Sequence, residues 1–362
     1  MQKRLPGIAT AAQRREFLEI IDTRSPAEFA ADHIPGAINC PALDDAERAE
    51  IGTLYKQVSA FAARRRGAAL VARNIARHLL EHFQDRERDW RPLIYCWRGG
   101  KRSESFVSVF RQIGWDAHQL TGGYKAYRSE VLQQLQELPS RLQFCVLCGP
   151  TGSAKSRILQ VLGHSGEQIL DLEQLAAHRG SVLGGLGDRA QPGQKMFESR
   201  LAEVLSHFRP ERRVFVEAES QHIGRLRLPE ALVTAMHAAC CVRIEAGRAA
   251  RTRHLLAEYA AQMADPGALM ARLALLTEIR GRKMIAHWQQ LIASGAWEEL
   301  VDSLLAEHYD PLYQRSQGKD FAHYASAATI TADDLSPDAW AGIAGTICAI
   351  AAPGCDPPAK AA

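Results

Sequence analysis

The stretch "IYCWRGGKRSES", residues 94–105, ends an apolar run with one cysteine and continues at once with two glycines, three cations and a serine. A thiol reacts as its thiolate, which neighbouring cations and converging backbone N–H groups stabilise. The glycines let the loop curl around Cys96, and the helix that follows adds partial positive charge at its N-terminus. We therefore predict Cys96 as a catalytic nucleophile at the base of an anion cradle. The predicted cradle residues are Arg98, Gly99, Gly100, Lys101, Arg102 and Ser103.

An ordinary alternative is that Cys96 is a buried strand residue beside merely solvated cations. The combination of strand, cysteine, glycine-rich loop, cations and helix favours the reactive site over that alternative.

The composition is that of an ordinary globular protein. The 362 residues are 46% hydrophobic and 23% charged, and this length is typical of about two domains. A net charge of +3 permits an anionic partner without demanding one. No apolar run is long enough to span a bilayer, and the N-terminal sequence lacks the apolar region of a secretory signal. We expect a cytoplasmic protein that makes no contact with a membrane.

Two successive α/β units are predicted, because short β-rich runs alternate with helical patterns in both halves of the chain. We place the first domain at residues 1–138 and the second at 139–350, where 139–141 is the linker. Residues 268–306 have a mostly helical pattern, so the second domain gains a helical C-terminal part. The tail, 351–362, is small and Pro-rich, and we expect it to be disordered.

Eight cysteines are spread along the chain without the spacing of a disulfide framework or a metal site. Cys145 and Cys148 form a C-x-x-C within the apolar run "LQFCVLCGP". On a strand, positions three apart point to opposite faces and cannot share a metal. We therefore expect these two thiols to be core residues, and we predict no metal site.

The stretch "GPTGSAKS", residues 149–156, lies between a predicted strand and a predicted helix, which is the context of a P-loop. Its amides would wrap a diphosphate, Lys155 would reach the outer phosphate, and Ser156 could bind Mg²⁺. Ala154 replaces the glycine that normally precedes the lysine, and Glu217 and Glu219 follow a strand where an NTPase usually has an aspartate. Diphosphate binding without ATP hydrolysis fits better than a motor or kinase, and the alternative is a turn that binds nothing. The predicted diphosphate residues are Gly149, Thr151, Gly152, Ser153, Lys155 and Ser156.

Arginines gather in two helical segments of the sequence. Arg64, Arg65 and Arg66 open the first, and residues 243–253 contain the second. Each segment is either a solvated face or a contact for a phosphate backbone, and the sequence leaves both readings open.

The stretch "IDTRSPAEFAADHIPGAIN" resembles the amino-terminal signature of rhodanese domains, and "YCWRGGKRS" resembles their catalytic loop. The resemblance implies that Cys96 carries a persulfide or perselenide, and that Arg24 is structural, pairing with Glu28 or packing near the loop. The C-x5-R-S spacing is larger than in common rhodaneses and matches phosphatases, although Tyr95 stands where those enzymes usually have histidine. A phosphate-bearing donor such as selenophosphate would satisfy both features.

Joined in this order, the rhodanese-like domain and the P-loop NTPase-like α/β domain resemble the tRNA 2-selenouridine synthase family. Further stretches that carry the resemblance are "LTGGYKAYR", "DLEQLAAHRGSVLGG", "QPGQKMFE", "VFVEAESQHIGRLRLP" and "HYDPLYQRS". The family implies conversion of wobble 2-thiouridine in tRNA to 2-selenouridine. Geranyl diphosphate first alkylates the sulfur, and selenium from selenophosphate then replaces the geranylthiol. The alternatives are a rhodanese-type sulfurtransferase or C-x5-R phosphatase fused to an NTPase, and a non-catalytic RNA-binding module.

The resemblance also implies substrates and contacts for particular residues. We expect no tightly bound cofactor, with Mg²⁺ left open, and a transient contact with an enzyme that supplies selenophosphate. Arg179 or Lys195 would help to bind the diphosphate. The histidines in the next set could equally cap or pack. The expected tRNA or prenyl contacts are Arg64, Arg65, Arg66, His178, Arg179, Glu219 and His222.

Overall fold

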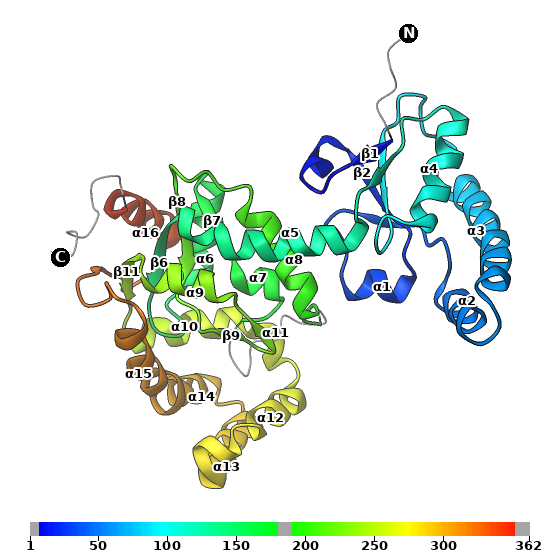
Figure 1. Cartoon of the computed structure of the whole chain (residues 1–362). Helices are drawn as coiled ribbons and strands as arrows, with labels where there is room; N and C mark the ends of the chain where they lie inside the picture. The colour runs from blue at the N-terminus through cyan, green and yellow to red at the C-terminus, as the bar shows by residue number, and fades with distance from the viewer. Residues whose placement is uncertain (1–6, 180–189, 352–362) are drawn as a thin grey trace. The chain divides into compact units, whose positions relative to one another are not determined.

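The computed structural model describes residues 7–179 and 190–351 (Figure 1). They form two compact units. Unit 1 contains the described residues up to 134 together with 193–203, and unit 2 contains those from 135 to 192 and from 204 onward. Except for Ala351, the predicted disordered tail lies outside the described residues.

Unit 1 is built on a five-stranded sheet in the order β1-β5-β4-β2-β3, and all of its strand pairs are parallel. The strands predicted from "EFLEIID", "RPLIYC" and "AHQL" are present. β1 and β3 are two residues long, too short to show a period of two in the sequence. The strands are β1 (Ile8–Ala9), β2 (Glu19–Asp22), β3 (Ile38–Asn39), β4 (Pro92–Tyr95) and β5 (His118–Leu120).

Amphipathic helices and aromatic packing hold this sheet in place. Helix α4 buries Phe106, Val107 and Phe110 at helical spacing, and these side chains pack with Ile21 and Ile94 of the strands. α4 ends where Gly114 adopts the left-handed φ of 119°. The helices of this part of the chain are α1 (Pro26–Ala31), α2 (Asp45–Gln57), α3 (Ala60–His82), α4 (Lys101–Ile113) and α5 (Gly123–Glu137), with a 3₁₀ turn at Ala12–Glu16.

Of the two alternatives predicted for Arg24, packing near the loop is confirmed, because its guanidinium lies 3.9 Å from the centre of the Tyr124 ring and the Tyr124 N–H donates to the Cys96 carbonyl. The other alternative, pairing with Glu28, is wrong. Arg24 Nη2 lies 2.6 Å from Asp22 Oδ2 and also donates to the Asp32 carbonyl at 2.6 Å. Asp22 is fully buried at the end of β2, and a buried carboxylate needs a charged partner close by. Glu28, nearer the surface, accepts instead from Arg48 and Arg102.

Residues 193–203, from a segment far along the chain, belong to unit 1. Arg14 is 4% exposed and pairs with Glu130 at 2.6 Å and with Glu203 at 3.2 Å. Arg128 likewise pairs with Glu198. Partly buried ion pairs therefore fasten this segment to α5 and to the first 3₁₀ turn.

Unit 2 contains a second five-stranded parallel sheet, in the order β12-β11-β6-β8-β7, and a separate two-stranded hairpin. β6 lies at the centre, so the loop that follows it opens at the carboxyl edge of the sheet, where α/β folds place their ligands. The strands are β6 (Gln143–Cys148), β7 (Gln168–Leu170), β8 (Arg213–Glu217), β9 (His222–Ile223), β10 (Leu226–Arg227), β11 (Cys240–Glu245) and β12 (Ala328–Thr331).

Helices α6 and α16 pack together on this sheet (Figure 1). A second hydrophobic core, formed among helices, lies around Trp288. The predicted helical pattern over 268–306 is confirmed, with breaks at Gly281 and Gly295, whose φ angles are positive. A 3₁₀ turn at Pro139–Arg141 precedes β6, and a π-helical turn at Leu305–Tyr309 joins α14 to α15. The helices of unit 2 are α6 (Lys155–His164), α7 (Leu172–Ala176), α9 (Glu230–His237), α10 (Arg248–Glu258), α11 (Ala260–Met263), α12 (Pro266–Ala274), α13 (Thr277–Ser294), α14 (Trp297–Leu304), α15 (Asp310–Asp320) and α16 (Pro337–Ile350). Helix α8 (Gln194–Leu205) belongs mostly to unit 1.

The C-x-x-C cysteines are buried strand residues, and each has a thiol partner on β11. Cys145 and Cys148 are both 0% exposed. Hydrogen bonding with Cys240, together with burial, raises the pKa of Cys145, and Cys241 does the same for Cys148. These thiols therefore stay protonated at neutral pH. Among the described residues, no helix combines the length and apolarity needed to cross a bilayer.

We predict that Arg24→Met destabilises the protein by about 3–5 kcal/mol, because it leaves the Asp22 carboxylate buried without its partner. Urea unfolding of the full chain, followed by near-ultraviolet circular dichroism, measures this change. Arg66→Met is the matched control, since Arg66 pairs with Glu50 on the surface and both side chains are about half exposed. The control should leave the unfolding free energy unchanged, and equal effects of the two variants would contradict the prediction.

Candidate active sites

Cys96 lies immediately after β4, with its thiol at the bottom of the glycine-rich loop. The residue is 3% exposed. Its Sγ accepts hydrogen bonds from the Gly100 N–H at 3.1 Å and the Ser103 hydroxyl at 3.2 Å. Helix α4 begins at Lys101, so both donors come from its N-terminal end. The structure therefore confirms the strand–loop–helix arrangement predicted around this thiol.

The local hydrogen bonds favour the thiolate of Cys96. Burial by itself raises the pKa of the thiol, but the donors Ser103 and Gly100 and the nearby charge of Arg102 outweigh that effect. The net result is a lowered pKa. The pKa values of Cys40, Cys145, Cys148 and Cys348 are raised instead, so the environment of Cys96 is the one among these five that suits a nucleophile.

The cations contribute less than the sequence predicted. Arg98 and Lys101 are exposed, and Lys101 pairs with Glu104 at 3.1 Å. Arg102 is three-quarters buried and pairs with Glu28 at 3.3 Å. The closest donors to the sulfur are therefore a backbone amide and a hydroxyl.

A second glycine turn, which the sequence analysis did not assign to the site, supports the cradle from below. The Tyr124 N–H donates to the Cys96 carbonyl at 2.8 Å. A side chain at Gly123 would overlap that carbonyl oxygen and the Gly99 N–H. Gly99 and Gly123 both have φ near +60°. The motif "LTGGYKAYR" is thus a structural part of the Cys96 loop.

Gln119 of β5 is another site residue that the sequence did not reveal. Its Nε2 donates to Ser103 Oγ at 2.7 Å and to the Gly100 carbonyl at 3.1 Å. The Ser103 hydroxyl hydrogen lies between two acceptors, Cys96 Sγ and the Gly100 carbonyl, each 3.2 Å from Oγ. Because Gln119 donates to that same carbonyl, it competes with Ser103 there and favours the bond from Ser103 to Cys96 Sγ. The sequence does not reveal this contact, because β5 becomes the neighbour of β4 only when the sheet forms.

We predict that Ser103→Ala raises the pKa of Cys96, because the variant removes a donor that stabilises the thiolate. Alkylation of Cys96 by iodoacetamide, followed by peptide mass spectrometry across pH, measures the change. The midpoint should move to higher pH, and the rate at neutral pH should fall about tenfold, the value of one hydrogen bond to a charged group. Ser108→Ala, exposed on the same helix, is the control. An unchanged midpoint in Ser103→Ala would contradict the assignment.

The P-loop follows β6 in unit 2 as predicted. Lys155 is the first residue of α6, and its Nζ donates to the carbonyls of Gly149 and Pro150 at 2.8 and 3.2 Å. The Ser153 hydroxyl donates to the Pro150 carbonyl at 2.9 Å. A side chain at Gly149 would press on Ser153 and on the backbone of β11. The loop therefore curls tightly around its own lysine.

Ala154 adopts the left-handed conformation that glycine favours, with φ of 59° and ψ of 19°. A non-glycine residue there costs about 1–2 kcal/mol. Its methyl group is 5% exposed and packs in the core with Ile158 and Leu159. The alanine therefore retains the glycine-type backbone of the turn, and core packing offsets part of the cost.

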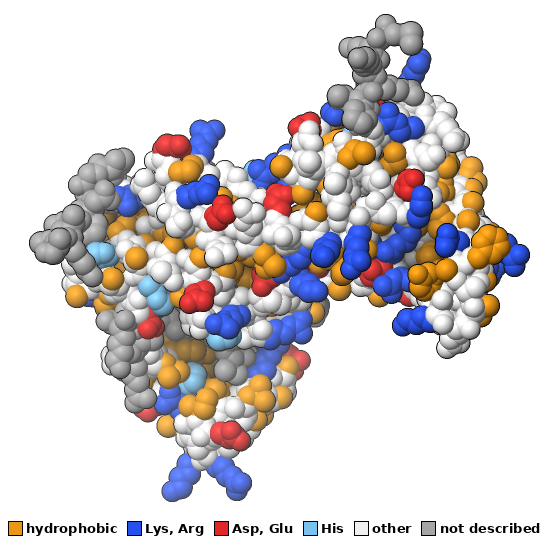
Figure 2. Space-filling model, viewed as in Figure 1, with side chains coloured by type: hydrophobic (Ala, Val, Ile, Leu, Met, Phe, Trp, Pro, Cys, Tyr) orange, Lys and Arg blue, Asp and Glu red, His pale blue; other side chains and the backbone are white. Residues whose placement is uncertain are grey.

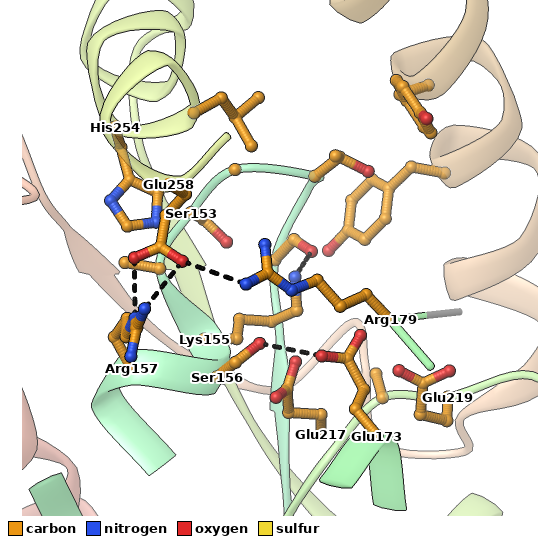
Figure 3. Close-up of a pocket in the computed structure, with 18 of the residues that line it drawn as sticks. Ser153, Lys155, Ser156, Arg157, Glu173, Arg179, Glu217, Glu219, His254 and Glu258 are labelled. Carbon is orange, nitrogen blue, oxygen red and sulfur yellow. Dashed lines mark hydrogen bonds and ion pairs between the residues drawn. The ribbon is translucent and has the colours of Figure 1, made fainter. Parts of the chain in front are cut away.

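A large pocket of about 970 Å³ opens over this loop (Figure 3). All six predicted diphosphate residues line it, together with Arg179 and Glu219. Lys155 and Ser156 lie at its floor, and the pocket walls come from α7, α10 and the π-helical turn. The structure thus brings the predicted phosphate-binding residues together in one space.

Three carboxylates face Ser156 across the floor of this pocket (Figure 3). The carboxylate oxygens of Glu173, Glu217 and Glu219 lie within 4.8 Å of one another, and Ser156 Oγ donates to Glu173 at 3.4 Å. Burial, with repulsion from the other carboxylates, raises the pKa of Glu173 to about 9 and that of Glu219 to about 8. Burial also raises the pKa of Glu217, whose Oε1 has no hydrogen-bond partner. Such a group suits a divalent cation beside a phosphate.

A cluster on the opposite wall joins the predicted Arg179 to two residues that the sequence analysis did not name, Arg157 and Glu258. Glu258 of α10 accepts from Arg157 at 2.7 and 3.0 Å and lies 3.7 Å from Arg179 (Figure 3). Arg179 also stacks over Tyr259, 5.0 Å from the ring centre. The carboxylate therefore holds two guanidinium groups at the pocket, where they can meet a phosphate.

Arg251 anchors the P-loop from behind. It is 5% exposed, donates to the Thr151 carbonyl at 3.1 Å, and forms two hydrogen bonds of 2.8 Å with Asp310. This arginine came from a segment left open as a possible nucleic-acid contact, and its burial makes it structural instead.

The other predicted contacts lie elsewhere on the described chain. His178, His222 and Lys195 do not line the pocket, and the side chain of His222 is exposed on β9. Arg64, Arg65 and Arg66 are exposed on α3. Figure 2 shows Lys and Arg side chains near hydrophobic ones over α2 and α3. The exposed large hydrophobic residues on or between these helices are Tyr55, Val58, Phe61 and Leu80.

Comparison with known proteins identifies the family. Residues 7–130 match the model of the rhodanese-like domain, and residues 142–271 match that of the tRNA 2-selenouridine synthase AAA domain. A tRNA 2-selenouridine synthase from Shewanella denitrificans is 33% identical over 338 residues, 85% of this chain and 91% of that protein. The chain belongs to the tRNA 2-selenouridine synthase family. The predicted family and α/β fold class are therefore confirmed.

Two further members of the tRNA 2-selenouridine synthase family show the range of the match. The one from Cupriavidus necator is 35% identical over 344 residues, 85% of this chain and 92% of its own. The one from Nitrosomonas europaea is 35% identical over 244 residues, 66% of this chain and 63% of its own, so that alignment spans somewhat less than two thirds of this relative.

Proposed function

We propose that this enzyme converts 2-thiouridine at the wobble position of tRNA to 2-selenouridine in two steps, with one step at each of its two sites. The observation that carries the proposal is that one chain of this family contains both a reactive thiol site and a phosphate-binding pocket. Unit 1 holds a buried thiol with a lowered pKa, and unit 2 holds a P-loop pocket with paired cations and carboxylates.

The first step takes place at the P-loop, with geranyl diphosphate as the alkyl donor. The thiocarbonyl sulfur attacks C1 of the geranyl group, the C1–O bond breaks, and its electron pair leaves on the diphosphate. Negative charge grows on the diphosphate as the bond breaks, so fixed amides and the Lys155 ammonium stabilise the transition state more than the ground state. The base then loses its N3 proton. No ATP is split in this step.

Mg²⁺ fits the same pocket. Ser156, Glu173, Glu217 and Glu219 supply oxygen ligands, and a divalent cation would remove the repulsion that raises the pKa values of these carboxylates. The ion would neutralise charge on the leaving diphosphate.

The second step uses the Cys96 loop and selenophosphate. The amides and Ser103 that stabilise the thiolate also suit the phosphate part of this donor. The Cys96 thiolate attacks the phosphorus of selenophosphate, the P–Se bond breaks, and selenide is released beside the base, after which water hydrolyses the S–P bond and phosphate leaves. The selenide adds to C2 of the base and the C2–S bond breaks. The geranylthiolate leaves and takes up a proton. We place both steps in the cytoplasm, with selenophosphate delivered by a transient contact with the enzyme that makes it.

We predict that the two steps separate by mutation. Lys155→Ala should stop geranylation of thiolated tRNA yet spare selenation of tRNA that is supplied already geranylated. Cys96→Ser should spare geranylation and stop selenation. Liquid chromatography and mass spectrometry of the nucleosides made by purified, folded protein without ATP measure both. Cys145→Ala, a buried thiol outside both sites, is the control. A strict ATP requirement, or loss of both activities in either variant, would overturn this division.

tRNA binding should depend on the exposed arginines of α3. Replacing Arg64, Arg65 and Arg66 with Ala should lower the slope of log affinity against log salt by about two to three, at roughly 0.7–0.9 per phosphate contact. Fluorescence anisotropy with labelled tRNA at several salt concentrations measures the slope. Arg86→Ala with Arg88→Ala controls for net charge. An unchanged slope in the triple variant would make these arginines a solvated helix face.

A further inference from the structure

A second, smaller cavity of about 70 Å³ adjoins the P-loop pocket within unit 2. Its wall is apolar apart from Thr151 and Gln262. Five residues line both spaces: Thr151, Leu255, Tyr259, Gln262 and Tyr309. The rest of the wall includes Met263, Leu269, Trp297, Leu300, Leu304 and Leu305.

We propose that this cavity binds the far end of the apolar chain whose diphosphate the P-loop holds, and so sets the chain length that the enzyme accepts. The proposal rests on the proposed function and deepens it, because it assigns residues to the hydrocarbon half of the substrate. Thr151 links the phosphate site to the apolar cavity, because it belongs to the phosphate loop and also lines the cavity.

The size of the cavity fits one isoprene unit. At 10–15 Å³ per water-sized site, 70 Å³ offers room for about five to seven small heavy atoms. A ten-carbon chain would then lay its first five carbons along the shared wall of Leu255, Tyr259 and Tyr309, and its last five in the cavity. A five-carbon chain would leave the cavity empty, and a fifteen-carbon chain would exceed it.

The helical part of unit 2 holds the cavity wall rigidly. Leu300, Leu304 and Leu305 are at most 5% exposed and come from α14 and the π-helical turn that follows it. Such turns are frequent at functional sites, and here the turn brings Leu305 and Tyr309 to the same wall. Arg280 fixes the turn through hydrogen bonds of 2.9 and 3.0 Å to His308.

A nucleoside is the competing occupant. Gln262 lines the boundary, and its Oε1 has no hydrogen-bond partner, so it could accept from a base. The remainder of the cavity is lined by leucine, methionine and tryptophan side chains, and burying hydrocarbon against them is favourable. A base and ribose placed there would leave their polar edges without hydrogen-bond partners.

The test compares dimethylallyl, geranyl and farnesyl diphosphates as substrates of the purified full chain acting on thiolated tRNA. The wild type should favour geranyl over dimethylallyl by up to about 10³-fold in kcat/KM, at roughly fourfold per buried carbon. Leu300→Trp fills the cavity and should cut this preference at least 30-fold. Leu300→Ala enlarges the cavity and should raise the use of farnesyl relative to geranyl. Leu291→Ala, in the same helical core but outside the cavity wall, is the control and should leave the ratios unchanged.

Calorimetric binding gives a readout that does not depend on turnover. Leu300→Trp should weaken the binding of an unreactive geranyl thiolodiphosphate at least tenfold. Inorganic diphosphate should bind to the variant with unchanged affinity, which also shows that the pocket is folded. If the wild type fails to geranylate tRNA but this binding pattern appears, the proposed function fails and the cavity assignment stands. Unchanged chain-length ratios in both Leu300 variants overturn the assignment. The assignment is also overturned if Leu300→Trp weakens the binding of ATP as much as it weakens the binding of the prenyl analogue.

Discussion

The buried ion pair between Asp22 and Arg24 is the constraint on which the thiol site depends. The Arg24 guanidinium lies 3.9 Å from the centre of the Tyr124 ring, and the Tyr124 backbone N–H holds the Cys96 carbonyl. The Tyr124 hydroxyl donates to Asp32 at 2.7 Å, and the Asp32 carbonyl accepts from Arg24. One closed network thus joins the ends of β2 and β4 to the glycine turn that contacts the Cys96 loop. The charges are costly to bury, and their geometry fixes that loop in place.

Short-range donors dominate the chemistry of Cys96 because the thiol is nearly enclosed. A hydrogen bond to a buried anion acts at full strength, whereas an exposed cation is screened by water and competes with its own ion pair. Lys101 satisfies Glu104, and Arg102 satisfies Glu28. An incoming anionic donor therefore has to compete with Glu104 and Glu28 for these two cations. The same loop therefore separates two tasks, stabilisation of the thiolate inside and attraction of phosphate outside.

The sequence predicted those parts of the sites that lie on one continuous stretch. Cys96, the glycines after it and Lys155 each sit in a strand–loop–helix segment, whose function follows from local spacing. Gln119 and Glu258 could not be predicted, because each reaches its site from a different element through sheet pairing or helix packing. The Arg24 partner was missed for a related reason. Asp22 and Glu28 are both near in sequence, and only the burial of Asp22 decides between them.

Under the proposed function, the P-loop pocket would hold a departing diphosphate and would not split ATP. Hydrolysis needs a positioned water and a phosphoryl group held in line, whereas ionisation of an allylic diphosphate needs charge stabilisation at one end and a fixed carbon chain at the other. In this chain, the carboxylates and arginines surround the phosphate loop, and the apolar cavity begins at Thr151. Binding energy from the hydrocarbon, realised far from the breaking bond, can orient C1 towards the sulfur of the base. The division of the pocket into a charged floor and an apolar extension is thus the feature that suits alkyl transfer.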